Sequence, residues 1–478
     1  MTSSSGIKEE RTSCVKNGEL FSIYSKPEKI LVAALVSVAA SFSGFASNIY
    51  FPALPTIAED LAVSNELVNL TVTTYMIFQG IAPTFWGAMA DVHGRRLVYI
   101  GTLAVFLTAC IVLANTKNYA TLIVVRCLQS SGSASTIALG AGVIGDITVR
   151  SERGGYMAMF LTGSLVPVAI GPIIGGTLSK SLGWRWVFWI LAIYCGAFML
   201  ILILILPETL RYLVGNGSTK VEGFKKFPLV FYQLRYQKRS GIKIHEPDSS
   251  QAHTNKVSLL GPLKIFCDQK VLFVITFLSL HYTVWQMSIT ILSSLFKTIY
   301  GLDETKIGLT FIANGIGSIL GTLLTGKILN FDYKNYQAKH ADRPVVIRHV
   351  RLRTVWIWSG MQIASIIVFG WTLQKRVHIS VPIIATFFTG WGAVAIQSVV
   401  STYLVDLYEN KSASATAALN LARCLLGAGG TAVVTPLLDA ISIGWGFTLL
   451  AAVLLAVLTA NLLHLYLKKA EQNNKEVE

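Results

Sequence analysis

A short polar segment between two apolar runs carries the most distinctive chemistry of this chain. Its sequence, Gly87-Ala-Met-Ala-Asp91-Val-His-Gly94-Arg95-Arg96, places one acid and two bases within a few residues. Gly87 permits close approach of two helices. The acid can sit at the positive N-terminal end of another helix, while the arginines remain in water at a membrane surface. We interpret Gly87, Asp91, Gly94, Arg95 and Arg96 as a gate; the alternative is a basic turn that only sets topology.

Polar side chains inside an apolar run form a second group. Arg126, Gln129, Ser130 and Ser133 recur at helical spacing and share one face. A charge within an apolar run is costly, so it must face a cavity or a partner. Because an arginine hardly titrates, a functional role for Arg126 would be to tune a nearby acid or to organise water. The alternative is a hydrogen-bonded contact between helices.

Titratable groups are scarce within the apolar runs. Asp91, Asp146 and Asp406 all lie at the ends of runs, and no acid falls near a centre. His281 titrates near neutral pH and is the internal alternative, although a packing role fits it equally well. The predicted proton-coupling residues are therefore Arg126, Asp146 and His281.

Aromatic and polar side chains that share helix faces could line a cavity for a solute. Aromatic walls with few formal charges suit amphipathic or cationic organic molecules through stacking and cation–π contacts. Each residue taken alone is also compatible with packing or with a membrane interface. The predicted cavity residues are Asn48, Tyr50, Tyr75, Gln79, Gln129, His281, Trp285, Asn314, Trp391, Gln397, Asn420 and Arg423.

The elements that position these residues are membrane spans. Of 478 residues, 53% are hydrophobic and 14% are charged, against about 25% charged in a soluble domain. A span needs about 20 apolar residues. Twelve such runs occur, near residues 30–50, 66–88, 97–115, 119–145, 155–178, 184–206, 270–293, 307–329, 354–374, 379–404, 412–436 and 445–467. The predicted fold is an all-α polytopic membrane protein with twelve transmembrane helices.

The order of these runs predicts two six-helix pseudo-repeats. They are a bundle at 30–206 and a bundle at 270–467, with a central loop at 207–269 and tails at 1–29 and 468–478. Asp146 and Asp406 occupy equivalent positions after the fourth and tenth runs. The second copy of the gate segment, Gly326 to Lys334, has Asn330 in place of the acid, so the halves are not interchangeable. Paired repeats around a central site are typical of rocking transporters.

Charge sets the predicted orientation. The net charge is +15, and most of the 40 lysines and arginines fall on the side that carries both termini. That asymmetry predicts cytoplasmic termini and loops rather than nucleic-acid binding. We find no nucleophile–base pair, phosphate loop or cluster of metal ligands, which argues against an enzyme. No cofactor or metal is predicted. The expected partners are a small molecule, protons and the lipid bilayer, with the chain acting as a monomer.

A fifth run with two prolines and several glycines adds a further motif. Pro167, Gly171, Pro172, Gly175 and Gly176 would kink one helix and flatten its side for tight packing. A kinked helix occurs in other polytopic proteins too. The segment resembles the antiporter motif of drug exporters, with Val166 before Pro167 where the motif often has glycine.

Together these motifs resemble the major facilitator superfamily, and in particular the fungal twelve-span drug:proton antiporters of the quinidine-resistance-like branch. Four further segments carry that resemblance, which extends from Ile30 to about Leu467: Asn48-Ile-Tyr50-Phe-Pro52, Gly183-Trp-Arg185-Trp, Pro207-Glu-Thr and Ala418-Leu-Asn420-Leu-Ala-Arg423. The resemblance implies that Asp91 grips the start of span eleven, near Ser412–Ser414, when the gate closes. It associates Arg126 with proton transfer, although Gln129 is followed by Ser130 where the family has glycine.

The leading functional hypothesis is export of a drug-like, amphipathic or cationic solute by proton antiport with alternating access. The alternative is an exporter of organic acids, polyamines or secreted metabolites, which could work as a uniporter. A different class would be a non-transporting membrane sensor, which the short tails disfavour. The resemblance implies the plasma membrane as the location, with the vacuolar membrane as the alternative.

Overall fold

The computed structural model describes residues 15–16, 19–20, 22–216, 269–339, 351–408 and 412–475. A two-stranded antiparallel pair, β1 (Val15–Lys16) and β2 (Glu19–Leu20), precedes the helices. The first half contains α2 (Lys26–Asn48), α4 (Asn65–His93), α5 (Arg95–Ala114), α6 (Tyr119–Ile147), α7 (Arg150–Ser181) and α8 (Arg185–Ile205). The second half contains α12 (Gln269–Tyr300), α13 (Glu304–Lys339), α15 (Val355–Gln374), α16 (Ser380–Leu407), α17 (Ser412–Ile441) and α18 (Ile443–Lys475). Short helices fill the connections: η1 (Phe51–Ala53), α3 (Leu54–Asp60), α9 (Arg211–Val214) and η4 (Leu352–Thr354).

These long helices confirm the predicted all-α fold with twelve transmembrane helices in two pseudo-repeats. Within the described ranges, eleven segments are long and apolar enough to cross a membrane on length and composition alone. The helix outside that set is α4, whose buried side chains include Asn69, Thr71 and Thr73. Since these polar groups face other helices rather than lipid, α4 can still span. The central loop lies mostly outside the described residues, and α18 continues beyond the expected limit of 467 to Lys475.

Helix ends follow local signals in the sequence. Ser64 accepts a hydrogen bond from the amide of Leu67 at the start of α4, and Asn118 does the same for Thr121 at the start of α6. Gly94 separates α4 from α5 with a φ of 107°, which favours glycine.

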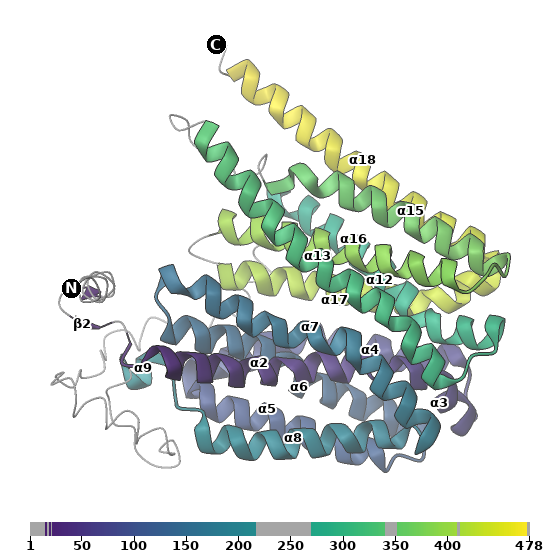
Figure 1. Cartoon of the computed structure of the whole chain (residues 1–478), viewed down its shortest axis with the longest axis horizontal. Coiled ribbons are helices and arrows are strands. Elements are labelled where there is room, and N and C mark those ends of the chain that lie inside the picture. The colour runs from purple at the N-terminus through teal and green to yellow at the C-terminus, as the bar shows by residue number, and fades with distance from the viewer. Residues whose placement is uncertain are drawn as a thin grey trace, which may run out of the picture.

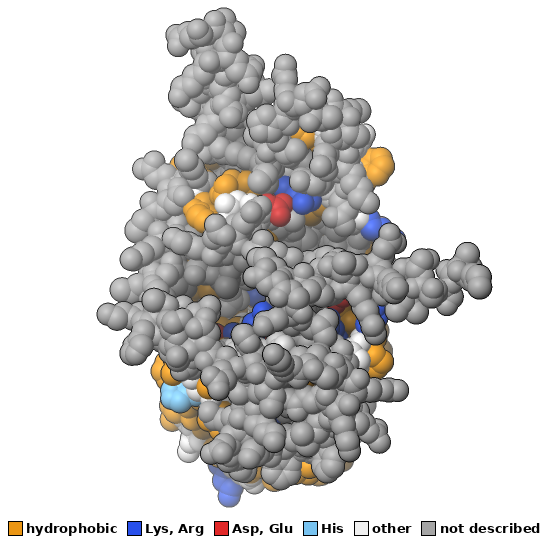
Figure 2. Space-filling view, turned by 90° about the vertical axis from the view of Figure 1, so that its left-hand side faces the viewer, with side chains coloured by type: hydrophobic (Ala, Val, Ile, Leu, Met, Phe, Trp, Pro, Cys, Tyr) orange, Lys and Arg blue, Asp and Glu red, His pale blue; other side chains and the backbone are white. Residues whose placement is uncertain are grey.

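The start of α2 and the end of α18 lie on the same side of the molecule, which we call the tail side (Figure 1). The opposite end, where α3 lies, is the far side. The lower bundle in Figure 1 is the first half and the upper bundle is the second half, and α13 and α18 slope away from the first half toward the tail side. Figure 2 views the tail side, where lysine or arginine side chains lie beside acidic ones on the visible part of the surface.

The apolar cores show where the halves meet. One core cluster joins residues of both halves, such as Leu54 and Val72 with Val284 and Phe311. Two further clusters lie each within a single half and extend to the tail side. The halves therefore share a core from the far side to the middle and have separate cores toward the tail side.

Hydrogen bonds between α4 and α17 follow the same pattern. Asn69 donates to Thr435 at 2.9 Å, and the hydroxyls of Thr73 and Thr431 are 2.9 Å apart. Among the described residues, the hydrogen bond of this set nearest the tail side joins the amide of Asn420 to the carbonyl oxygen of Gln79. A Cβ at Gly87, two turns further along α4, would meet no atom within 4 Å.

Candidate functional site

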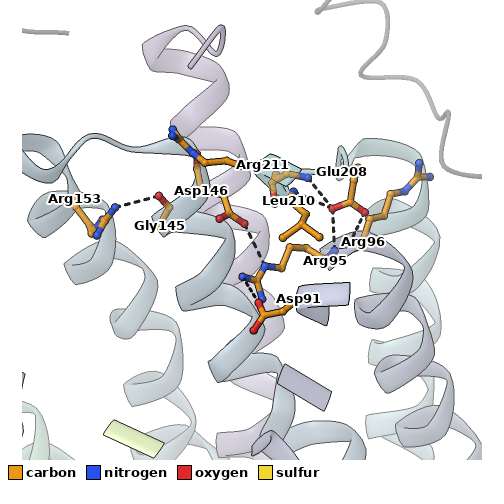
Figure 3. A network of polar contacts seen from close by, with 10 residues as sticks. Asp91, Arg95, Arg96, Gly145, Asp146, Arg153, Glu208, Leu210 and Arg211 are labelled. Atoms are coloured by element: carbon orange, nitrogen blue, oxygen red, sulfur yellow. Dashed lines mark hydrogen bonds and ion pairs between the residues drawn. The ribbon is translucent and has the colours of Figure 1, made fainter. Parts of the chain in front are cut away.

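The gate segment is held together by ion pairs within the first half (Figure 3). The guanidinium of Arg95, the first residue of α5, lies 2.7 Å from Asp91 at Nη2 and 3.2 Å from Asp146 at Nε. Asp146 is the penultimate residue of α6, so Arg95 ties three helix ends together. The Asp91 side chain remains 51% exposed. It therefore keeps a surface on which a second partner can bind.

Glu208 fixes the start of α5 and was not recognised as functional from the sequence. Its carboxylate accepts hydrogen bonds from the backbone amides of Arg95 at 2.8 Å and Arg96 at 3.3 Å. It also accepts from the amides of Thr209 and Leu210, both at 3.0 Å. A carboxylate at a helix N-terminus complements the helix dipole. Glu208 thus sets the position from which the Arg95 side chain reaches its two acids.

The second half contains an equivalent ion pair. Arg351, just before α15, donates from Nε to Asp406 at the end of α16 at 2.8 Å and from Nη1 to the carbonyl oxygen of Leu329 at 3.1 Å. The pairs Arg95–Asp146 and Arg351–Asp406 join the third to the fourth and the ninth to the tenth span. Asn330 is the expected counterpart of Asp91 in the second half, and Ser412–Ser414 are the expected partners of Asp91. The side chains of these residues lie outside the described set.

Arg126 lies in a buried cage of the first half. Its guanidinium carbon is 4.0 Å from the ring centroid of Tyr50 and 4.3 Å from that of Tyr75. Nη1 donates to Gln129 at 2.6 Å and to the carbonyl oxygen of Ala46 at 3.2 Å, while Nε has no hydrogen-bond partner among the described residues. The side chain is 1% exposed. The structure thus brings together Arg126 of the proton-coupling set with Gln129, Tyr50 and Tyr75 of the cavity set.

Arg423 occupies a related position in the second half. Its Nε and Nη2 donate to the amide oxygen of Asn420 at 3.2 and 2.9 Å, and its guanidinium carbon lies 5.1 Å from the ring centroid of Tyr282. Asn420 in turn donates to the carbonyl oxygen of Gln79 in α4. Unlike Arg126, Arg423 is partly exposed. Tyr282 was missed from the sequence, although it follows His281 directly.

The remaining predicted cavity residues fall into separate groups. The indole of Trp285 donates to Asn314 at 2.9 Å. Trp391 stacks on Trp358 with 6.2 Å between the ring centroids, and its indole nitrogen has no hydrogen-bond partner in the described part of the chain. Gln397 is half-buried on α16. Asn48, on α2, donates to the carbonyl oxygen of Gly44 within its own helix.

His281 is fully buried between α12 and α15. Nδ1 lies 2.9 Å from the carbonyl oxygen of Phe277, which can only accept, so Nδ1 carries a proton. Nε2 lies 2.7 Å from the hydroxyl of Ser359 and accepts from it in the neutral ring. Both nitrogens are satisfied by residues of the second half. The contacts bring His281 together with Ser359 rather than with Asp146 or Arg126.

The proline–glycine segment of α7 lies between α2 and the second half. A Cβ at Gly175 would clash with the carbonyl oxygen of Ile49 in the first half. A Cβ at Gly176 would clash with the carbonyl oxygen of Glu304, and one at Gly308 with that of Pro172. Because these glycines lack side chains, α7 packs closely on the far side against Ile49 of its own half and against α13 of the second half.

Two six-helix halves with one shared core, two separate cores and a buried cationic centre are the architecture of a membrane transporter. The chain belongs to the Major Facilitator Superfamily, whose family model matches residues 36–431. The predicted family is thereby confirmed, and its members and relatives are transporters rather than enzymes.

Curated relatives cover nearly the whole chain. "Citrate exporter 1" of Aspergillus niger is 40% identical over 91% of this chain and 85% of its own length. "MFS antiporter QDR2" of Candida albicans is 33% identical over 90% of this chain and 87% of its own. "Quinidine resistance protein 1" of Saccharomyces cerevisiae is 30% identical, with coverages of 94% and 84%. The relation to the quinidine-resistance branch is therefore also confirmed.

A solved structure supports the fold. The human organic anion transporter MFSD10 (TETRAN) superposes with a TM-score of 0.57 at 15% sequence identity. The match covers 91% of this chain and 99% of that one.

Proposed function

We propose that this protein is a secondary active exporter of small organic anions, coupled to proton entry and working by alternating access. Residues 30–206 would rock against 270–467. The core shared on the far side, together with the separate cores on the tail side, supports two halves that pivot. With both termini in the cytoplasm, as the charge distribution favours, the described arrangement would be the one that accepts solute from the cell.

The observation that carries the anionic substrate is the pair of arginines without acid partners. Among the described residues, the hydrogen-bond partners of Arg126 and Arg423 are amide and carbonyl oxygens. A buried charge without a counter-ion is costly, so a bound carboxylate would compensate it. Arg423 is the first contact for the solute because it is partly exposed, and Arg126 adds positive potential behind Tyr75. The name of the Aspergillus relative, a citrate exporter, agrees with this class.

Cationic or amphipathic drugs are the second candidate. Two of the aromatic residues predicted to bind a cationic solute already contact an arginine of the protein, since Arg126 covers the rings of Tyr50 and Tyr75. Arg423 likewise approaches the ring of Tyr282. Trp285 and Trp391 remain as aromatic surface for such a solute. The names of the quinidine-resistance relatives support this candidate, which is also the leading hypothesis from the sequence. Like charge from two arginines disfavours it.

We propose that the protein acts as a monomer in the plasma membrane, with the vacuolar membrane as the alternative location. Measured movement of a solute across a membrane distinguishes a transporter from a non-transporting sensor. Dependence of that movement on a proton gradient distinguishes antiport from uniport.

The test is a solute panel in proteoliposomes that contain the purified full-length chain. Radiolabelled citrate, malate and quinidine are compared, with and without an imposed pH gradient and after its collapse by an ionophore. We expect carboxylate transport that the gradient accelerates. Quinidine transport without carboxylate transport would replace the anionic class by the cationic one. Carboxylate transport that ignores the gradient would indicate a uniporter, and no transport of any solute would favour the sensor.

A further inference from the structure

A group of charged side chains joins the two halves on the far side. Lys297, near the end of α12, places Nζ 2.8 Å from Oε1 of Glu59 in α3 and 3.7 Å from Oε1 of Glu304. The hydroxyl of Thr56 in α3 donates to the same oxygen of Glu304 at 2.8 Å. Glu304 is the first residue of α13. Glu304 of the second half is thus bonded to Thr56 of the first half. Lys297 of the second half is likewise paired with Glu59 of the first half.

A second cross-half pair lies close by. Lys180 at the end of α7 lies 2.7 Å from Asp303. Asp303 also accepts a hydrogen bond from the backbone amide of Lys306 at 2.9 Å, so it caps α13. Hydrogen bonds from Lys180 and from that amide hold the pKa of Asp303 below its usual range. Gly176 and the carbonyl oxygen of Glu304 meet between these two sets of charges.

Exposure singles out Glu304 among these charges. The side chains of Lys180 and Glu59 are 53% and 68% exposed, and solvent-exposed ion pairs contribute little because water and salt screen them. The Glu304 side chain is 17% exposed and Lys297 is 29% exposed, with two partners each. Separation of the halves on this side therefore costs more interaction free energy at Glu304 than at Lys180.

We propose that Thr56, Glu59, Lys297 and Glu304 form a latch that holds the far side closed, with Glu304 as its central positioning residue. Opening of the far side breaks the Thr56–Glu304 and Lys297–Glu59 contacts together, since each pair contains one member from either half. This inference rests on the proposed alternating access but not on the substrate. Loss of the latch raises the population that is open on the far side.

The experiment measures access to a buried position between the halves. Thr431 is 0% exposed, and its hydroxyl bonds to Thr73 across the interface. The reporter is Thr431→Cys in the purified full-length protein in detergent. The rate of thiol labelling at constant pH is divided by the rate in denaturant, after subtraction of the labelling of the parent chain.

Lys297→Met and Glu304→Gln each remove one charge of the latch. We expect Glu304→Gln to speed labelling by about tenfold, as for the loss of one charge-assisted hydrogen bond, and Lys297→Met by a smaller factor because Glu59 is 68% exposed. The double variant should label no more than about twofold faster than Glu304→Gln, since both changes disrupt one network. Unchanged labelling in either single variant, or effects that multiply in the double variant, would overturn the latch.

Arg185→Met is the matched control. Arg185 pairs with Asp60 at 2.9 Å on the same side, but both residues belong to the first half. We expect its labelling rate to equal that of the reporter alone. An increase as large as that of Lys297→Met would show a general loosening and overturn the proposal. Gel filtration and thermal unfolding of each variant confirm that it is folded.

The readout needs neither solute nor gradient. If solute transport fails while Lys297→Met still opens the far side, the latch stands and the proposed function falls. If transport proceeds but labelling does not respond, the latch alone is wrong.

Discussion

Arg423 provides the most direct test of how the centre of the molecule recognises its solute. Its guanidinium makes two hydrogen bonds to Asn420 and one ring contact with Tyr282, and it has no carboxylate partner among the described residues. In Arg423→Gln the positive charge is removed while the polar character and part of the length are kept.

The expected effect on binding is larger than the effect on folding. A hydrogen bond to a charged group contributes about 1.5–3 kcal/mol, which corresponds to about a 10- to 150-fold weaker affinity for a carboxylate. The lost contacts are one shared amide oxygen and a partly exposed cation–π pair, so unfolding free energy falls by only about 1–2 kcal/mol. The variant should therefore remain folded.

Binding is measured by competition with radiolabelled citrate on the purified protein, and folding by thermal unfolding. Arg423→Lys is the matched control, because it retains the charge but not the planar fork of donors. We expect its affinity to lie between those of the parent and Arg423→Gln. Parent-like affinity in a folded Arg423→Gln would refute the assignment of this arginine to the solute.

Three further changes probe the remaining parts of the site. Asp91→Asn should leave expression and folding intact but slow solute exchange, measured in proteoliposomes, and turnover at the parent rate would remove Asp91 from the gate. Glu208→Gln removes the charge that caps α5, at a cost of about 1–3 kcal/mol, so thermal unfolding should occur at a lower temperature; an unchanged midpoint would contradict the cap. If His281 carries the coupling proton, His281→Gln should abolish the pH dependence of export, whereas an unaltered pH profile would leave the ring a packing residue.

The backbone architecture could be predicted because membrane spans are specified by local composition. Runs of about 20 apolar residues and the basic asymmetry of the loops require no knowledge of tertiary contacts. The family motifs were equally local. Gly87 to Arg96 is one continuous segment, and Arg126 and Gln129 share a helix face. Periodicity therefore placed these residues correctly relative to their own helices.

Contacts between distant segments could not be predicted in the same way. Glu208 caps a helix that begins more than 100 residues earlier, and nothing near it in the chain indicates that partner. Lys297 and Glu304 fall between two apolar runs, and nothing near them in the chain indicates Glu59 and Thr56 as partners. The aromatic rings of Tyr50 and Tyr75 were recognised as cation-binding surfaces, but the cation that covers them is the protein's own Arg126.

The segment after α8 is anchored at several points before it leaves the described part of the chain. Glu208 binds the first amides of α5, Arg211 donates to the carbonyl oxygen of Asp146, and the carbonyl oxygen of Asn216 accepts from the amide of Ile23. The tether between the bundles consequently starts from a fixed point on the first bundle. A displacement of this segment would be transmitted through Glu208 to the backbone of Arg95, without any contact with Arg126 or Arg423.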